Sequence, residues 1–231
     1  MEFKNPRLLA ILNQIGECDC LCDIGTDHAF LPILAVQNKI AKRAIASDVK
    51  FGPLKIAEKN IVESGLQDRI SVVKSDGFRE FQPGEFDIAV IAGMGGHLIS
   101  DILGASPDVA RSCRKLILQP MMDIPFCREW LFQNKFDIID EVLAIDEHKV
   151  YVIITAVPVV VQINCLPEDI IIGPVLKLGR DSNFSLYVDK LIRRRKQRLA
   201  GLCVSGTKES FLASEIVKNE LELLHKFREK G

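Results

Sequence analysis

Strand-like runs of this chain end in carboxylates, a pattern typical of a binding site at one edge of a sheet. Asp23 and Asp27 lie in the segment CDIGTDHAFLP, residues 22–32, where an apolar run passes into a tight polar turn. Asp48 ends the next run, and Asp76 follows the third. In open α/β sheets, ligands bind beyond the carboxyl ends of the strands. We therefore expect these acids to line one cleft that holds a small molecule.

The first of these turns lacks the glycines that a dinucleotide needs. A dinucleotide fingerprint places three glycines near the pyrophosphate. Here Gly25 stands alone, with Asp27 and His28 at the other positions. A carboxylate repels a pyrophosphate and attracts a cation, so the turn disfavours NAD and favours S-adenosylmethionine, which has a positive end and no phosphate. We predict that Asp23, Gly25 and His28 bind this cofactor. A helix N-cap explains Asp27 equally well, and a structural role for His28 stays open.

The other two acids complete the predicted cofactor site. Asp48 suits the two hydroxyls of a ribose, and Asp76 suits an adenine amino group, with Gly77 permitting close approach. Taken singly, Asp48 is also explained as a helix cap, and Asp76 with Gly77 as an ordinary turn. The prediction depends on acids occurring at three successive strand ends.

A glycine-rich turn, IAGMGG at residues 91–96, closes the fourth strand-like run. Glycines at this density permit positive φ and expose backbone N–H groups, which admits a flat base against the backbone. A purely structural turn is the alternative. We predict that Ala92 and Gly93 contact the cofactor and that Gly93, Met94 and Gly95 hold the reacting base. The predicted substrate contacts nearby are Gly96, His97, Gln119 and Pro120.

Strand-like and helix-like runs alternate through the first two thirds of the 231 residues. The predicted strands are 19–24, 43–48, 70–74, 86–92, 115–119, 136–144 and 150–161. The predicted helices are 6–14, 31–38, 52–64, 97–103 and 124–134. Alternation of this kind predicts an α/β fold, a Rossmann-like, doubly wound, seven-stranded and mostly parallel sheet. Residues 146–149 are too few for a parallel crossover, so we expect the last strand to be antiparallel.

The sequence pattern of alternating strand-like and helix-like runs ends after Val161. Residues 164–174 hold two prolines and a glycine and are predicted to be a linker, and helical periodicity follows over 182–202 and 208–230. The turn Ser205-Gly206-Thr207 supplies an N-cap, which predicts an antiparallel α-helical hairpin. We expect two domains: residues 1–163, which bind the cofactor, and residues 164–231, the C-terminal hairpin.

Composition narrows the class of protein. Hydrophobic residues make up 48% and charged residues 26%, so the chain can bury a core. No apolar stretch reaches the roughly 18 residues of a membrane span, and the charged N-terminus is unlike a signal peptide. We expect a cytoplasmic location and no membrane partner. The oligomeric state stays open between a monomer and a weak dimer.

Three of the seven cysteines alternate along the first strand at Cys18, Cys20 and Cys22. They lack the two-residue gap usual in zinc sites, and no second cluster matches them. We expect reduced thiols packed on one face of the strand and no metal.

Positive charge gathers in the C-terminal part of the chain. Residues 161–231 hold 13 Lys and Arg against 9 Asp and Glu, whereas the remainder holds 17 against 22. The run around Arg193, Arg194 and Arg195 has almost no acidic partners at helical spacing, so it repels itself. A phosphate backbone relieves that repulsion, which favours RNA or DNA as a partner over a solvated helix face.

On these residues the chain resembles the bacterial tRNA (adenine-22-N1)-methyltransferase family over nearly its whole length. The similar segments are DIGTDHAFLP from Asp23, SDG from Ser75, VIAGMGG from Val90, LILQP from Leu116 and GPVL from Gly173. AGMGG is quite specific, because most adenine-amino methyltransferases carry an Asn-Pro-Pro-aromatic loop at that place. The sequence departs from the family at Met121, where Asn is common after Gln-Pro.

The resemblance implies a Rossmann-like methyltransferase domain with a C-terminal helical hairpin, S-adenosylmethionine as methyl donor and tRNA as acceptor. Transfer to adenine N1 needs no strong base, and Asp27 would stabilise the cationic product. Arg193, Arg194 and Arg195 would contact the tRNA. Two alternatives stay open: a methyltransferase for a small molecule or protein, and an RNA-binding protein whose methyltransferase fold is inactive.

Overall fold

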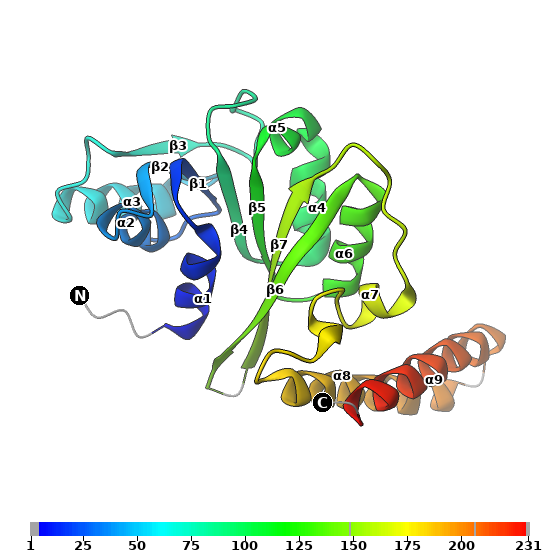
Figure 1. Cartoon of the computed structure of the whole chain (residues 1–231). Helices are drawn as coiled ribbons and strands as arrows, with labels where there is room; N and C mark the ends of the chain where they lie inside the picture. Colours follow the sequence, from blue (N-terminus) through cyan, green and yellow to red (C-terminus); the bar gives the residue numbers. More distant parts are fainter. Residues whose placement is uncertain (1–4, 148, 206, 230–231) are drawn as a thin grey trace.

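The computed structural model describes residues 5–147, 149–205 and 207–229. Within these ranges, seven strands form one sheet in the order β3-β2-β1-β4-β5-β7-β6 (Figure 1). The strands are β1 (Cys18–Ile24), β2 (Ala41–Asp48), β3 (Ile70–Lys74), β4 (Ile88–Met94), β5 (Lys115–Pro120), β6 (Phe136–Asp146) and β7 (Lys149–Pro158).

Helices connect these strands, and two long helices follow them. The helix before the first strand is α1 (Pro6–Ile15). The helices between strands along the chain are α2 (Phe30–Gln37), α3 (Phe51–Glu63), α4 (Gly96–Ala105), α5 (Pro107–Ser112) and α6 (Ile124–Gln133). After the sheet they are α7 (Pro167–Ile171), the 3-10 helix η1 (Leu176–Leu178), α8 (Phe184–Ser205) and α9 (Lys208–Arg228).

The sheet confirms the predicted fold class. The pairs β3–β2, β2–β1, β1–β4 and β4–β5 are parallel, whereas β7 is antiparallel to both β5 and β6. The antiparallel last strand therefore lies between β5 and the edge strand β6. Strand order reverses beside β1, and the carboxyl ends of β3, β2, β1, β4 and β5 meet at one edge.

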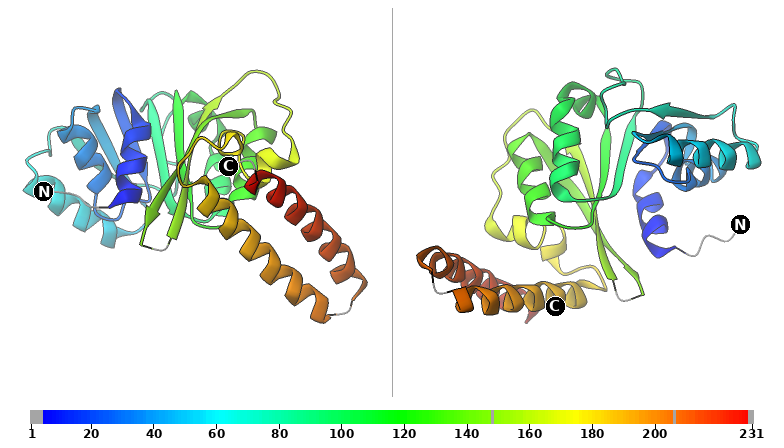
Figure 2. Two further views of the ribbon diagram at one scale, coloured as in Figure 1. Left: turned by 60° about the horizontal axis from the view of Figure 1, so that its bottom comes forward. Right: turned by 180° about the vertical axis from the view of Figure 1, so that it is seen from behind.

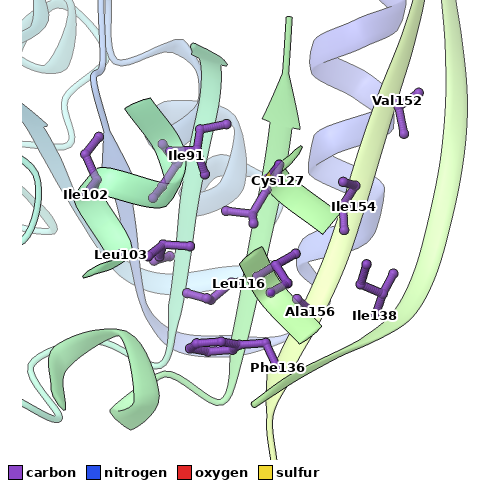
Figure 3. Close-up of a cluster of buried hydrophobic side chains, with 14 of the residues drawn as sticks. Ile91, Ile102, Leu103, Leu116, Cys127, Phe136, Ile138, Val152, Ile154 and Ala156 are labelled. Atoms are coloured by element: carbon purple, nitrogen blue, oxygen red, sulfur yellow. The ribbon is translucent and has the colours of Figure 1, made fainter. Parts of the chain in front are cut away.

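Helices cover both faces of the sheet and divide the core in two. α1, α2 and α3 pack on one face, and α4, α5, α6 and α8 pack on the other. Figure 3 shows the second cluster, where Phe136 and Leu116 lie among aliphatic side chains of the sheet and of α4. The cysteine prediction was partly wrong: Cys20 and Cys22 join this cluster, but Cys18 belongs to the first. All seven cysteines are free thiols.

Several boundaries differ from those predicted. β7 ends at Pro158 rather than at residue 161, because its partner β6 begins at Phe136, which pairs with Pro158. Beyond that point Val160 and Val161 are exposed. The predicted linker at 164–174 contains the short helix α7, whose Pro167 occupies the first turn. α5 was not predicted from the sequence, because its six residues are too few to show helical periodicity.

The two long helices form the predicted antiparallel hairpin. Figure 2 shows α8 and α9 side by side as an arm that projects from the sheet. Thr207 is the N-cap of α9 and its side chain accepts a hydrogen bond from the Ser210 N–H at 3.1 Å. Gly206 of the predicted turn, and the end of the helix predicted to reach residue 230, lie outside the described residues. Arg195 and Glu220 join the two helices at 2.8 Å.

A buried ion pair ties this arm to the sheet. Arg128 of α6 and Glu141 of β6 are both fully buried, and the Arg128 Nε donates to the Glu141 carboxylate at 2.8 Å. The guanidinium also donates to the Ile170 carbonyl at 3.1 Å and to the Tyr187 hydroxyl of α8 at 3.4 Å. The second Glu141 oxygen accepts from the Val175 N–H at 3.2 Å. One pair of charges thus holds α6, β6, the connecting segment and α8 together.

Replacing Glu141 with Gln should destabilise the protein strongly. The substitution keeps the size of the side chain but leaves the Arg128 guanidinium buried without an opposite charge. We expect the free energy of unfolding, measured by urea denaturation, to fall by about 3–5 kcal/mol. As a control, Arg228→Gln breaks the half-exposed pair with Asp189 and should cost less than about 1 kcal/mol. Equal losses in the two variants would contradict this account.

Candidate active site

The structure places the predicted site residues at one edge of the sheet. Asp76 follows β3, Asp48 ends β2, Asp23 lies near the end of β1, Gly93 near the end of β4, and Gln119 near the end of β5. These strands are parallel and adjacent in that order, so the residues form a row along the carboxyl edge. The edge therefore has acids on one side and a glycine turn with an amide on the other.

Backbone hydrogen bonds fix the turn after β1. The N–H groups of Gly25 and Thr26 both donate to the Ser47 carbonyl, at 2.7 and 2.9 Å. Gly25 has φ 78°, a conformation that favours glycine. The Thr26 hydroxyl accepts from the Ala29 N–H at 3.2 Å. Ala29, with φ 54°, directly precedes α2. The Thr26 hydroxyl thus closes the turn just before α2 begins.

Asp27 and His28 are available to a ligand. The Asp27 carboxylate lies 3.1 Å from His28 Nε2, and the side chains are 73% and 38% exposed. No side chain caps the start of α2, so Asp27 does not serve as the N-cap of that helix. The His28 ring stacks on Phe30 with centroids 5.0 Å apart. The backbone carbonyl of His28 accepts a hydrogen bond from the side-chain amide of Asn60. Asp27 therefore presents a solvated negative charge at the edge.

Asp23 is a buried acid. It is 8% exposed, and burial raises the pKa of its carboxyl to about 6, a shift that a hydrogen bond with Thr26 opposes and the nearby charge of Asp48 increases. A buried carboxylate of this kind gains from a cationic neighbour. Among the described residues, none pairs with it as a salt bridge.

Asp48 and Asp76 already have partners. The Asp48 side chain accepts from the Lys50 N–H at 2.7 Å, just before α3, which leaves its other oxygen for a ligand. The exposed Asp76 forms an ion pair with Arg79 at 3.3 Å. Gly77 has φ 62°, and Ile102 packs where a Cβ would lie, so packing as well as conformation requires glycine there.

The glycine turn after β4 is closely packed. Gly93 has φ 77°, and the terminal methyl of Met94 lies where a side chain at Gly25 would be. The Gly96 N–H donates to the Met122 carbonyl at 2.9 Å. A Cβ at Gly96 would collide with the backbone of Asp123. The turns after β1, β4 and β5 therefore touch, and Met94 lies between the predicted cofactor and substrate sides.

Sequence reasoning missed one residue of this edge, Arg7 of α1. Its Nη1 donates to the side-chain Oε1 of Gln119 at 3.2 Å and lies 4.0 Å from the Met121 sulfur. Nη1 is also 3.6 Å from the place that a Cβ on Gly93 would take. Gln119 is fully buried and lies 112 positions away, so no local motif signals the contact.

A groove lies between the start of α6, which follows the end of β5, and the basic helix α8. It has a volume of about 370 Å³, and its lining residues come from the start of α6, from α7 and from the hairpin. Arg194, Arg195 and Arg198 line it, and Phe126 on the opposite wall packs against His97 with ring centroids 3.8 Å apart. Arg195 is held by Glu220, and Arg193 does not line the groove. Arg194 and Arg198, both exposed, are therefore its available cations.

The residues present fit the predicted cofactor. Buried Asp23 and exposed Asp27 suit a cationic end, the free oxygen of Asp48 suits a ribose hydroxyl, and the exposed Gly93 leaves its backbone accessible. In the part of the chain that the structure describes, no cluster of His, Cys, Asp and Glu could hold a metal ion. No described helix is long and apolar enough to cross a membrane.

Comparisons with known proteins agree with this geometry. A family model described as a methyltransferase domain matches residues 4–154. The tRNA (adenine(22)-N(1))-methyltransferase of Bacillus subtilis is 40% identical over 156 residues, which are 67% of this chain and 66% of that protein.

Solved structures resemble the whole chain. The crystal structure of the B. subtilis m1A22 tRNA methyltransferase TrmK is 29% identical with a TM-score of 0.88, covering 99% of this chain and 100% of that one. A putative tRNA (m1A22) methyltransferase of Streptococcus pneumoniae, in complex with S-adenosylmethionine, is 26% identical with a TM-score of 0.86, covering 98% and 100%. The family resemblance expected from the sequence is confirmed.

The raised pKa of Asp23 gives stability a pH dependence. A carboxyl that is harder to ionise in the folded chain favours folding only while protonated. Its contribution is full below its unfolded pKa of 3.8 and is lost as pH rises through about 6. Relative to the wild type, Asp23→Asn should be similarly stable near pH 4 and more stable by up to about 3 kcal/mol near pH 8. Urea denaturation across this range measures the difference, and a difference independent of pH would contradict the shift.

Proposed function

The chain belongs to the methyltransferase domain family, and we propose that it transfers a methyl group from S-adenosylmethionine to N1 of an adenine in tRNA, at position 22. The observation that supports this most strongly is the similarity to the B. subtilis m1A22 enzyme along 99% of the chain, hairpin included. The acids and glycine turn at the carboxyl edge agree with it, since they supply a cofactor side and a base side in one cleft.

The acidic side of the edge holds the cofactor. Bound S-adenosylmethionine supplies an electrophilic methyl group on a sulfonium. Asp23 and Asp27 attract the positive charges of the amino-acid end, with His28 beside Asp27 orienting it. Asp48 binds the ribose, and Asp76 with Gly77 contacts the adenine, for which Asp76 must share its carboxylate with Arg79. Gly25, Ala92 and Gly93 keep the backbone close to the cofactor.

The glycine turn holds the reacting adenine. N1 has a free lone pair at neutral pH, so the residues of the cleft need only bring it into line with the methyl group and exclude water. Gly93, Met94 and Gly95 provide the surface for the base, and Gly96, His97, Gln119 and Pro120 border it. Pairing or stacking in the tRNA must be broken for N1 to enter the cleft. Asp27 then stabilises the cationic ring of the product.

The groove beside the hairpin continues this base side. It begins at residues 123–126, directly after the Met121–Met122 turn, and reaches Arg194 and Arg198. We propose that residues 1–163 carry out the methyl transfer and that residues 164–231 bind the tRNA backbone along this groove. Arg195 holds the hairpin together through Glu220 and so contributes indirectly. A tRNA substrate also supports a cytoplasmic location.

The reaction and its position can be tested with unmodified tRNA transcripts. With labelled S-adenosylmethionine, we expect methylation of a transcript that carries adenine 22 and none of the same transcript with guanine 22. Equal labelling of both would retain the methyltransferase but reject the position. Cofactor binding without labelling of either would favour a small-molecule or protein acceptor, and tRNA binding without cofactor binding would favour an inactive RNA-binding protein.

The groove can be tested by charge removal. We expect the double substitution Arg194→Gln and Arg198→Gln to weaken tRNA binding about 10-fold or more near 0.1 M salt and to reduce the slope of log K against log salt by about 2. Filter binding across salt concentrations measures both. Cofactor affinity should not change.

A matched control lies on the same helix. Arg193→Gln with Lys196→Gln removes two exposed charges outside the groove. A loss of tRNA affinity equal to that of the groove variant would show that the charge of the helix matters but the groove does not.

A further inference from the structure

The position of Arg7 is electrostatically unfavourable in the protein alone. It lies in the first turn of α1, after the N-cap Asn5 and Pro6, where the helix dipole disfavours a positive charge. That turn contains no acidic residue. Among the described residues, no carboxylate lies within ion-pair distance of the guanidinium, and its bonded partners are neutral. The part of the chain that the structure describes thus supplies no anion to this half-buried cation.

The surroundings of Arg7 hold the guanidinium in place rather than neutralise it. Gln119 accepts from Nη1, and its own amide nitrogen lies 3.4 Å from the Met121 sulfur, which fixes the orientation of the amide. The Tyr151 ring lies 5.6 Å from the guanidinium carbon on another side. Nη2 and Nε donate to none of the described residues. The fork is thus fixed in orientation and retains donors suited to an oxyanion.

The location favours an anion on the cofactor. Nη1 lies beside Gly93 on β4, and β4 is paired with β1, which carries the acidic turn. Met94 links the two turns by packing over Gly25. The amino-acid end of S-adenosylmethionine carries an ammonium and a sulfonium together with a carboxylate. The acids Asp23 and Asp27 account for the positive groups, and the carboxylate needs a cation close by.

We propose that Arg7 binds the α-carboxylate of the cofactor, reaching it from α1 while Gln119 and Tyr151 hold the guanidinium in position. The inference rests on the proposed function for the identity of the cofactor. Because the carboxylate is the same before and after methyl transfer, the contact stabilises substrate and product cofactor equally. Its loss should therefore raise the KM for the cofactor and leave the kcat at saturation unchanged.

Calorimetry of cofactor fragments tests the contact without tRNA or turnover. S-adenosylhomocysteine contains the carboxylate, decarboxylated S-adenosylhomocysteine lacks only that group, and 5′-methylthioadenosine lacks the whole amino-acid end. In Arg7→Gln, we expect the Kd of S-adenosylhomocysteine to rise about 10- to 100-fold and that of 5′-methylthioadenosine to stay within about 2-fold. Removing the carboxylate should weaken binding to the wild type, with little further effect in Arg7→Gln.

Two further variants separate binding from folding. Arg7→Lys keeps the charge without the fork and should give an intermediate loss. Arg111→Gln removes an exposed arginine whose guanidinium donates to the Asn134 carbonyl and to no other described residue, and this variant should bind every ligand as the wild type does. Unchanged affinity for 5′-methylthioadenosine reports that the adenosine pocket of Arg7→Gln is intact.

Other outcomes overturn the assignment. Equal losses for S-adenosylhomocysteine and 5′-methylthioadenosine would mean that Arg7 only shapes the pocket. If Arg7→Gln left the affinity for both of these ligands unchanged and raised the KM for tRNA, the guanidinium would bind a nucleotide phosphate instead. A wild type that binds neither ligand would overturn the proposed function and this inference with it, whereas ligand binding without tRNA methylation would overturn only the proposed acceptor.

Discussion

The buried pair of Arg128 and Glu141 is the interaction on which the arrangement of the site depends. Two charges without solvent are costly unless each is fully hydrogen-bonded, and here the remaining donors and acceptors meet the Tyr187 hydroxyl and backbone groups of residues 170–176. Those partners come from segments far apart in sequence, so the pair forms only when α6, β6, the connecting segment and α8 are all in place. The start of α6 forms one wall of the groove and α8 the other. The same contact that completes the fold therefore sets the distance between the cleft and the basic helix.

Charges of opposite sign lie at the two sides of the carboxyl edge. Acids lie along the ends of β1, β2 and β3, and the cations Arg7, Arg194 and Arg198 lie beyond β4 and β5. A zwitterionic cofactor and a polyanionic acceptor fit such a division. The positive groups of the cofactor would meet the acids, its carboxylate would meet Arg7, and the acceptor would meet Arg194 and Arg198. Asp23 shows the energetic cost of this arrangement, because its burial opposes ionisation in the absence of a positive neighbour. Ionisation of buried Asp23 lowers the stability of the fold. A cationic ligand beside this carboxylate would restore that stability.

The sequence predicted the features that depend on local order. Hydrophobic periodicity located the strands to within a few residues, and parallel connectivity then required Asp23, Asp48, Asp76 and Gly93 to share one edge. It failed where long-range contacts decide. Arg7 reaches Gln119 across 112 positions, and only the packing of α1 on the sheet brings them together. In the sequence, Arg195 is equivalent to its basic neighbours, because its ion-pair partner Glu220 lies 25 positions away on the facing helix. Asp27 does not cap α2 as its position in the sequence suggested. The Thr26 hydroxyl, one residue earlier, closes the turn instead, and this depends on the detailed path of the backbone.

The base of the hairpin arm packs on the core of the protein, and apolar side chains near its far end are exposed. Tyr187, Val188 and Leu191 of α8 and Leu224 of α9 pack into the core, whereas Val204, Phe211 and Leu212 near the far end are exposed. A helix of 22 residues is about 33 Å long. Because the base of this arm is fixed on the sheet, the length of the arm sets a distance. A partner that touches the far end of the arm while its adenine lies at the carboxyl edge must hold those two points that distance apart. The protein would then select its partner by the distance between these two points of contact as well as by charge.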